Sequence, residues 1–149
     1  MKRGFTLIEL LISMAILGIL ATLGFGNFKN ARLKAADAKK KSDLTTIAKS
    51  LEAYVNDHRS YPISSNGRIV CITPNTTCDW GEPFSDGSTT YAATLPEPTT
   101  EYIYNSDGTS YTIYTRLEND QDPSVTVITP TVLCGNAECN YKITSSNIQ

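Results

Sequence analysis

Residues 1–25 of this chain of 149 residues read MKRGFTLIELLISMAILGILATLGF. Two basic residues and Gly4 precede an apolar run that begins at Phe5 and contains one carboxylate, Glu9. The run is about as long as the roughly 20 residues that a helix needs to cross a bilayer. Because a charge inside such a segment costs at least ~2.5 kcal/mol, Glu9 needs a polar partner there. The stretch therefore predicts a helix that meets another polar group inside the membrane or inside an assembly.

Other interpretations of an N-terminal apolar segment explain these residues less well. A secretory signal peptide is cleaved at small residues after its apolar core, whereas this core is followed by residues 24–28, GFGNF. A plain membrane anchor fits the length but gives Glu9 no purpose. The positive-inside rule places Lys2 and Arg3 in the cytoplasm and the rest of the chain on the far side of the membrane.

Residues 2–11, KRGFTLIELL, resemble the class III signal of type IV pilins and type II secretion pseudopilins. The resemblance implies that a prepilin peptidase cleaves between Gly4 and Phe5 and that the new amine of Phe5 is N-methylated. It also implies that Glu9 pairs with the Phe5 amine of a neighbouring copy as a helical filament grows. Since a buried carboxylate and a buried ammonium are each costly alone, such a pair would set register more than affinity.

Apolar residues continue at three- and four-residue steps beyond the first segment, and no proline occurs before Pro62. The stripe consists of Leu44, Ile47, Ala48, Leu51, Tyr54 and Val55. This spacing predicts one long helix from about residue 5 to about residue 57. We therefore expect a cleaved leader at 1–4, a transmembrane or filament-core helix at 5–27, an amphipathic continuation at 28–57 and an exported head at 58–149.

The sequence of the head, residues 58–149, predicts a loop region followed by a small sheet. Alternating aromatic runs at 101–105 and 110–117 flank Asp107-Gly108, which predicts a hairpin. Further strands are expected at 125–128 and 141–143, and residues 63–100 have a loop composition. The family resemblance implies an α+β fold, type IV pilin-like, in which the C-terminal half of a long N-terminal helix packs on a small antiparallel β-sheet with disulfide-stapled loops.

Four cysteines lie in the part of the chain expected outside the cytoplasm: Cys71, Cys78, Cys134 and Cys139. An even number in an exported domain favours disulfides, and the local pairs 71–78 and 134–139 are preferred among the three connectivities. Zinc is the competing interpretation, but the spacings exceed Cys-x₂-Cys and the only histidine, His58, lies elsewhere. His58 is expected at the surface of the helix exit rather than as a catalytic base.

The net charge of −2 is unevenly distributed. Residues 28–55 are mainly basic, whereas the residues from Asn56 onward are mainly acidic. Two interpretations remain open. The two surfaces are merely solvated, or the basic stalk of one subunit lies against acidic heads of others and sets their orientation. An acidic head gives no reason to expect direct nucleic-acid binding, which depends on phosphate contacts.

The sequence shows no enzyme pattern, because it has no glycine-rich phosphate loop and no nucleophile-elbow serine. The best cation candidate is a calcium loop with oxygen ligands from Glu118, Asn119, Asp120 and Asp122. Major pseudopilins bind calcium in a loop after the corresponding strand, so the resemblance adds to this candidate. The alternative is a solvated acidic turn, and no other cofactor is expected.

The principal functional hypothesis is a structural subunit of an extracellular type IV pilus. The precursor would sit in the inner membrane with its head outside until the assembly machinery extracts it. One alternative is the major pseudopilin of a type II secretion system, in a periplasmic pseudopilus. The segments Tyr61-Pro62 and Trp80-Gly81, which resemble major pseudopilins, favour it. Another is a minor or tip pilin acting as a binding module, through Trp80, Phe84 or the tyrosines, although most of these side chains are expected to fill the core.

Overall fold

The structure is a computed structural model that describes residues 4–71 and 76–145, without the side chains of residues 22–27. Residues 1–3 of the expected leader lie outside the described part. The chain falls into two compact units, Met1–Ala36 and Asp37–Gln149. The second unit thus begins inside the segment 28–57 that the sequence analysis treated as the amphipathic part of the helix.

Helix α1 spans Leu7–His58 and supplies residues to both units. In the first unit its large apolar side chains are exposed, as is Phe5 just before it. Within the described residues, no helix combines the length and apolar character that a membrane span requires.

In the second unit, α1 forms one wall of the core. Leu44, Ile47 and Leu51 are completely buried, and Tyr54 and Val55 pack beside them. Burying each such aliphatic side chain stabilises the fold by roughly 1.5–3 kcal/mol. The stripe predicted from the sequence is therefore confirmed. The helix ends before Arg59, whose backbone has a left-handed φ of 62°, and Pro62 follows.

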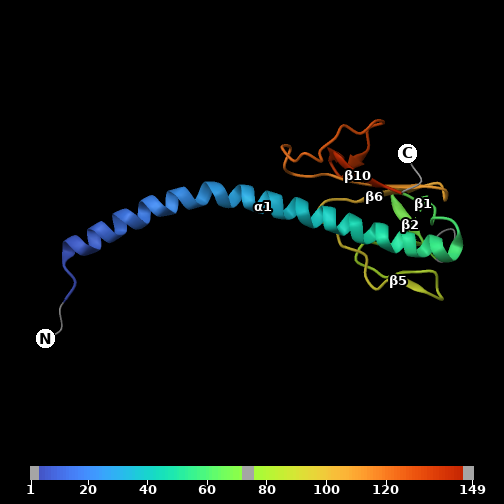
Figure 1. Ribbon diagram of the computed structural model, residues 1–149, viewed down its shortest axis with the longest axis horizontal. Helices are drawn as coiled ribbons and strands as arrows, with labels where there is room; N and C mark the ends of the chain where they lie inside the picture. The colour runs from blue at the N-terminus through green and yellow to red at the C-terminus, as the bar shows by residue number, and fades with distance from the viewer. Residues whose placement is uncertain (1–3, 72–75, 146–149) are drawn as a thin grey trace. The chain divides into compact units, whose positions relative to one another are not determined.

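All strands of the head pair in antiparallel fashion, in short sheets. One sheet has the order β10-β7-β6, formed by β6 (Ile103–Ser106), β7 (Tyr111–Thr115) and β10 (Tyr141–Thr144). Another has the order β1-β2-β3, formed by β1 (Ser64–Ser65), β2 (Arg68–Val70) and β3 (Thr77–Cys78). Two-stranded pairs are formed by β4 (Phe84–Ser85) with β5 (Thr90–Ala92) and by β8 (Leu133–Cys134) with β9 (Ala137–Glu138). In the view of Figure 1, β6 and β10 lie on one side of the second half of α1 and β5 on the other.

The hairpin predicted around Asp107-Gly108 is confirmed. It joins β6 to β7 with Tyr104 opposite Ile113, and Gly108 adopts a φ of 90° that favours glycine. Oδ1 of Asp107 accepts hydrogen bonds from the backbone N–H groups of Thr109 and Ser110, which closes the turn. The α+β architecture predicted from the sequence, a long helix whose second half packs on small antiparallel sheets, is what the structure shows.

One strand expected in the head was wrong. Residues 125–128 form no strand: the Thr126 N–H donates to the Asn140 carbonyl at 2.8 Å, just before the edge strand β10, but no ladder continues from this bond. Ile128 is buried against Cys134 and Cys139, but Val127 remains 92% exposed. Residues 63–100, whose composition is typical of loops, contain the strands β1–β5, which are too short for a periodic signal.

Candidate functional site

The expected processing site lies just before the helix. Gly4 and Phe5 precede α1, and the Phe5 side chain is 82% exposed. A Cβ built on Gly4 would meet nothing within 4 Å, so packing within the subunit does not explain this glycine. Gly4 and Phe5 are both exposed and lie outside the helix, so the peptide bond between them is accessible to a protease.

Glu9 lies in the first turn of α1 and forms a capping box with Thr6. Its Oε2 accepts hydrogen bonds from the Thr6 backbone N–H at 3.0 Å and from Oγ1 of Thr6 at 2.6 Å. In return, Oγ1 of Thr6 accepts a bond from the Glu9 backbone N–H at 3.4 Å. A negative charge here also suits the positive end of the helix dipole. The carboxylate is thus held at the helix start, exposed and four residues after Phe5, whose amine is its expected partner.

The apolar residues around Glu9 form an exposed surface. The large ones in the first unit are Phe5, Leu7, Ile8, Leu10, Leu11, Ile12, Met14, Ile16, Leu17, Ile19 and Leu20. Apolar exposure on this scale marks an interaction or membrane surface rather than a solvated one. Glu9 is the one carboxylate among these apolar side chains.

The aromatic side chains of the head serve its core rather than a binding surface. Nε1 of Trp80 donates to the backbone carbonyl of Tyr102 at 3.1 Å, and the hydroxyl of Tyr104 donates to that of Pro62 at 2.6 Å. Phe84 is fully buried and Trp80 nearly so. Burial, followed by the hydrogen bond to Glu52, raises the pKa of Tyr61 to about 12. Adhesion through Trp80 or Phe84 therefore has no support in this fold.

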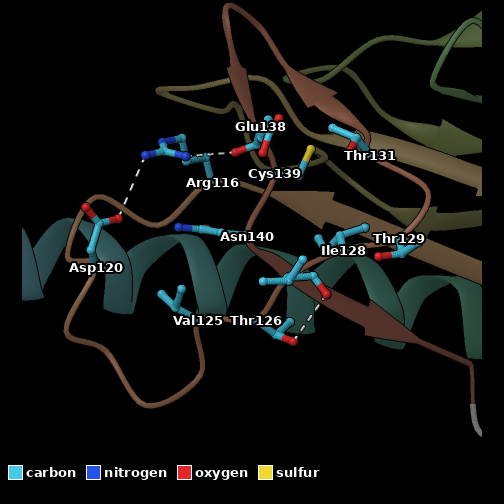
Figure 2. A pocket seen from close by; sticks show the side chains of 11 residues that line it. Arg116, Asp120, Val125, Thr126, Ile128, Thr129, Thr131, Glu138, Cys139 and Asn140 are labelled. Atoms are coloured by element: carbon cyan, nitrogen blue, oxygen red, sulfur yellow. Dashed lines mark hydrogen bonds and ion pairs between the residues drawn. The ribbon is translucent and has the colours of Figure 1, made fainter.

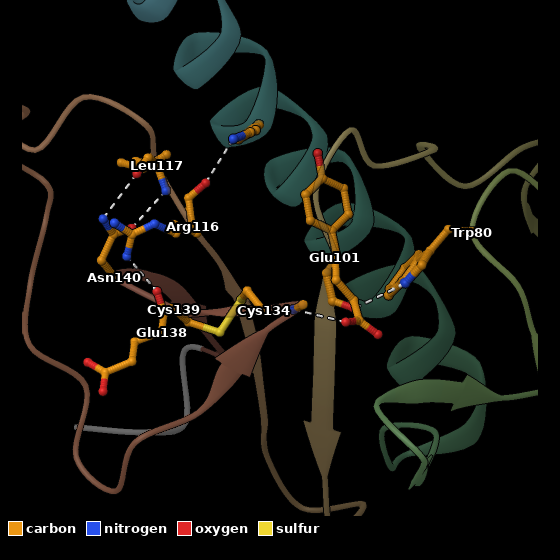
Figure 3. The surroundings of a disulfide bond; sticks show 11 residues. Trp80, Glu101, Arg116, Leu117, Cys134, Glu138, Cys139 and Asn140 are labelled. Carbon is orange, nitrogen blue, oxygen red and sulfur yellow. Dashed lines mark hydrogen bonds between the residues drawn. A yellow bond between two sulfur atoms is a disulfide. The ribbon is translucent and has the colours of Figure 1, made fainter.

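Both cysteine pairs are local in the structure: Cys71 bonds Cys78, and Cys134 bonds Cys139. The second disulfide closes the β8–β9 hairpin (Figure 3). Oε2 of Glu101 accepts a hydrogen bond at 3.0 Å from the backbone N–H of Gly135 in that hairpin. With Ile128, this disulfide forms a small second hydrophobic core. That core fixes the conformation of the segment from Ile128 to Cys139, which has only two short strands.

His58 fastens the end of α1 to the β4–β5 hairpin. Its Nε2 lies 2.7 Å from Oδ2 of Asp86, and its ring stacks on Tyr54 at 4.1 Å. Backbone N–H groups of Thr89 and Ser88, and then His58, hold the pKa of the Asp86 carboxyl well below its usual range. Nε2 also lies 3.1 Å from the Tyr91 hydroxyl, which itself donates to Asp86 and Asp57, so His58 belongs to a network of contacts that holds the helix end to the hairpin.

A hollow of about 310 Å³ lies beside the second disulfide (Figure 2). Arg116 lies on its wall between Glu138, whose backbone carbonyl accepts from its Nη1 at 2.9 Å, and the Asp120 carboxylate at 3.8 Å. The remaining lining is largely threonine and aliphatic side chains, such as Thr126 and Val125. Its one cationic group is engaged within the chain, so nothing in this hollow suggests catalysis.

The expected calcium loop has a different organisation. Glu118 pairs with Nζ of Lys40 at 3.0 Å, Asp122 with Nζ of Lys41 at 2.7 Å, and Asp120 with Arg116. Among the residues that the structure describes, no three His, Cys, Asp or Glu side chains gather as a metal site. The four candidate ligands share one loop but do not converge, and calcium stays a prediction that their geometry does not favour.

Sequence reasoning missed Asp37 and Lys40, the two buried charged residues that meet this loop. Lys40 was counted as part of an exposed basic stalk. The available signal was its spacing: Asp37, Lys40 and Leu44 lie at steps of three and four, so they share the face of the apolar stripe.

A glycine before the helix, a carboxylate five residues beyond it and a long helix that packs on small sheets define the pilin-like class of fold. Residues 1–25 match the family model described as "Prokaryotic N-terminal methylation motif". The protein named Type II secretion system core protein G of Vibrio cholerae serotype O1 is 31% identical over 114 residues, which cover 75% of this chain and 76% of that one. The chain belongs to the type IV pilin and pseudopilin family, whose members are structural subunits rather than enzymes.

Proteins with the same name from other bacteria match shorter stretches. That of Aeromonas hydrophila is 32% identical over 96 residues, covering 64% of this chain and 66% of that protein. That of Pectobacterium carotovorum subsp. carotovorum is 35% identical over 75 residues, covering 50% and 48%. The chain thus spans between about half and two thirds of the length of these two relatives. No solved structure matches it significantly.

Proposed function

We propose that this chain is the major pseudopilin of a type II secretion system. The supporting observation is the alignment with a type II secretion core protein G over three quarters of both chains. It extends well beyond the shared N-terminal motif, so it includes the head. This favours the alternative of the sequence analysis over its principal hypothesis, the surface pilus.

In this proposal the chain begins as a membrane-anchored precursor with its head outside the cytoplasm. A prepilin peptidase removes residues 1–4, and the Phe5 amine is methylated. Glu9 then exchanges its hydrogen bonds with Thr6 for the amine of a neighbouring copy. That exchange replaces a solvated capping box with a desolvated charge pair. Only the correct stagger between subunits pairs both buried charges, so any other stagger is strongly unfavourable.

Packing among copies covers the exposed apolar side chains from Phe5 to Leu20. Lipid tails are as apolar as these side chains, so extraction replaces lipid contacts with close packing rather than gaining from expulsion of water. The head, with a net excess of acidic residues, faces the aqueous compartment.

A surface pilus remains the second candidate, because the loop at residues 118–122 departs from the calcium loop that the pseudopilin resemblance implies. Deleting the gene separates the two candidates. A pseudopilin predicts that secreted enzymes accumulate inside the cell envelope while surface fibres persist. Loss of sheared surface fibres with normal secretion would reject the pseudopilin and support the pilus. Restoration by the wild-type gene is the control.

A further inference from the structure

The loop that follows β7 is fastened to helix α1 by three charged side chains. Lys40, Lys41 and Asp37 lie in the first two turns of α1 within the second unit, and all three bond to residues 116–124. Each contact joins residues that are about eighty positions apart in the sequence, and each uses a side chain of the helix rather than strand-to-strand backbone bonds. The charges of the helix therefore hold this loop, together with Asn140, whose side chain bonds both backbone groups of Leu117.

Three cationic side chains bond to residues of this loop: Lys40, Lys41 and Arg116. Lys40 is the most deeply buried of them, with a side chain that is 1% exposed. Its Nζ donates to the backbone carbonyl of Arg116 at 2.9 Å and to Oε1 of Glu118 at 3.0 Å. A main-chain carbonyl together with a carboxylate oxygen is the kind of oxygen set that proteins offer to calcium. Here an ammonium group of the chain itself receives it.

Lys41 repeats the arrangement further along the loop. Its Nζ donates to Oδ1 of Asp122 at 2.7 Å and to Oγ of Ser124 at 2.9 Å, and it lies 5.6 Å from the ring centre of Tyr141. The same Asp122 oxygen accepts the backbone N–H of Ser124, which closes the turn. The hydrogen bond from Lys41 and that N–H lower the pKa of Asp122.

Asp37 provides the opposite charge at the start of the loop. It is 1% exposed, and its two carboxylate oxygens accept the backbone N–H groups of Glu118 and Asn119 at 2.8 and 2.9 Å. The loop is thus held by an anion that binds its amides and by cations that bind its oxygens. Both are contributed by one helical segment, so no external ion is required to balance them.

A divalent cation does not fit this arrangement. Glu118 and Asp122 direct their oxygens at two different ammonium groups, and Asp120 faces Arg116 instead. To gather these oxygens around one ion, the protein would have to displace a buried lysine and leave its charge unpaired, which is strongly unfavourable. We propose that Lys40 and Lys41 replace calcium as the cations that order this loop, so that the folded head is independent of calcium.

The test uses the processed full-length chain in detergent micelles and does not depend on filament assembly. Backbone amide hydrogen exchange is measured for residues 118–125 in EGTA and in excess calcium chloride, for the wild type, Lys41→Met and Lys39→Met. Lys39 is the matched control, because it is the same residue type on the same turns but is exposed. Lys40→Met is compared by thermal unfolding, since loss of a buried charge can affect the whole head.

We expect wild-type exchange rates to agree within about twofold with and without calcium. Lys41→Met should accelerate exchange at Ser124 and Val125 by about tenfold, because the Asp122 turn loses its clamp. Lys39→Met should leave these rates unchanged. Calcium that slows wild-type exchange tenfold would overturn the proposal, as would equal rates in Lys41→Met and Lys39→Met. Neither outcome bears on whether the filament is a pseudopilus or a pilus.

Discussion

The hydroxyl of Tyr102 donates a hydrogen bond of 2.8 Å to Oδ2 of Asp43, which ties the residue before β6 to helix α1. Tyr102 is almost completely buried, and its ring packs edge-to-face against Trp80 with the ring centroids 5.9 Å apart. Burial, and then the Asp43 carboxylate, raise the pKa of Tyr102 well above its usual range. One side chain thus links the helix, the sheet and the tryptophan.

Tyr102→Phe should lower the free energy of unfolding of the head by roughly 1.5–3 kcal/mol, the range for hydrogen bonds to charged groups. The ring would remain in place, so the loss reports the hydroxyl and the Asp43 oxygen it leaves without a partner. Denaturant unfolding of the two proteins measures it. Tyr114→Phe is the control, because no described hydrogen bond uses the Tyr114 hydroxyl. Equal stability of the two variants would show that the Asp43 contact contributes nothing.

Alkaline pH should destabilise the head through its buried tyrosines. The pKa of Tyr61 is raised to about 12 in the fold, chiefly by burial and next by the hydrogen bond to Glu52, whereas an unfolded tyrosine titrates near ~10. A raised pKa gives stability that is complete below pH ~10 and is lost as pH rises toward 12. Tyr61→Phe should lose less stability between pH 10 and 12 than the wild type. Parallel losses in both proteins would contradict this assignment.

Glu9→Ala should leave export and leader cleavage intact but reduce filament formation severely. The reason is that the proposed amine of Phe5 would then lack its carboxylate partner in the assembled state. Electron microscopy of filaments and immunoblots of the processed subunit measure the two steps. Ser13→Ala is the control, one turn further along, where the hydroxyl bonds only the Glu9 carbonyl of its own helix. Normal filament numbers in Glu9→Ala would refute the pairing.

Gly4→Val should block removal of the leader, although the fold has room for the new side chain. A Cβ at Gly4 meets nothing within 4 Å among the described residues, so we expect the defect to arise at the peptidase rather than in folding. Mass spectrometry of the N-terminus reads the outcome directly. Gly18→Ala, at a second glycine with open space around its Cα, should be processed normally. A mature chain beginning at Phe5 in the Gly4→Val protein would refute the assigned site.

The helix stripe and the β6–β7 hairpin could be predicted because both are local patterns. Leu44, Ile47 and Leu51 follow the period of a helix, and Asp107-Gly108 is a turn signal that needs no distant partner. Likewise, the motif around Gly4 and Glu9 is contiguous. Each of these features is encoded within about a dozen neighbouring residues.

The remaining features depend on contacts between distant residues. Residues 125–128 alternate like a strand, but a strand requires a ladder of backbone bonds to a neighbour, and here the Thr126 N–H makes a single bond to Asn140, just before β10. Lys40 looks like a surface lysine until Arg116 and Glu118 are placed beside it. Charge type and spacing therefore suggested calcium, whereas the position of a helix across the loop supplies the cations.

The placement of core residues on α1 also determines the order in which the head can mature. Leu44, Ile47 and Leu51 are synthesised long before Tyr104 and Ile113, their partners across the core. Because the two sides of the core are far apart in the chain, a long loop must close before any of these side chains is covered, and closing such loops slows folding. The stripe on α1 is therefore buried only when β6 and β7 have paired beside it.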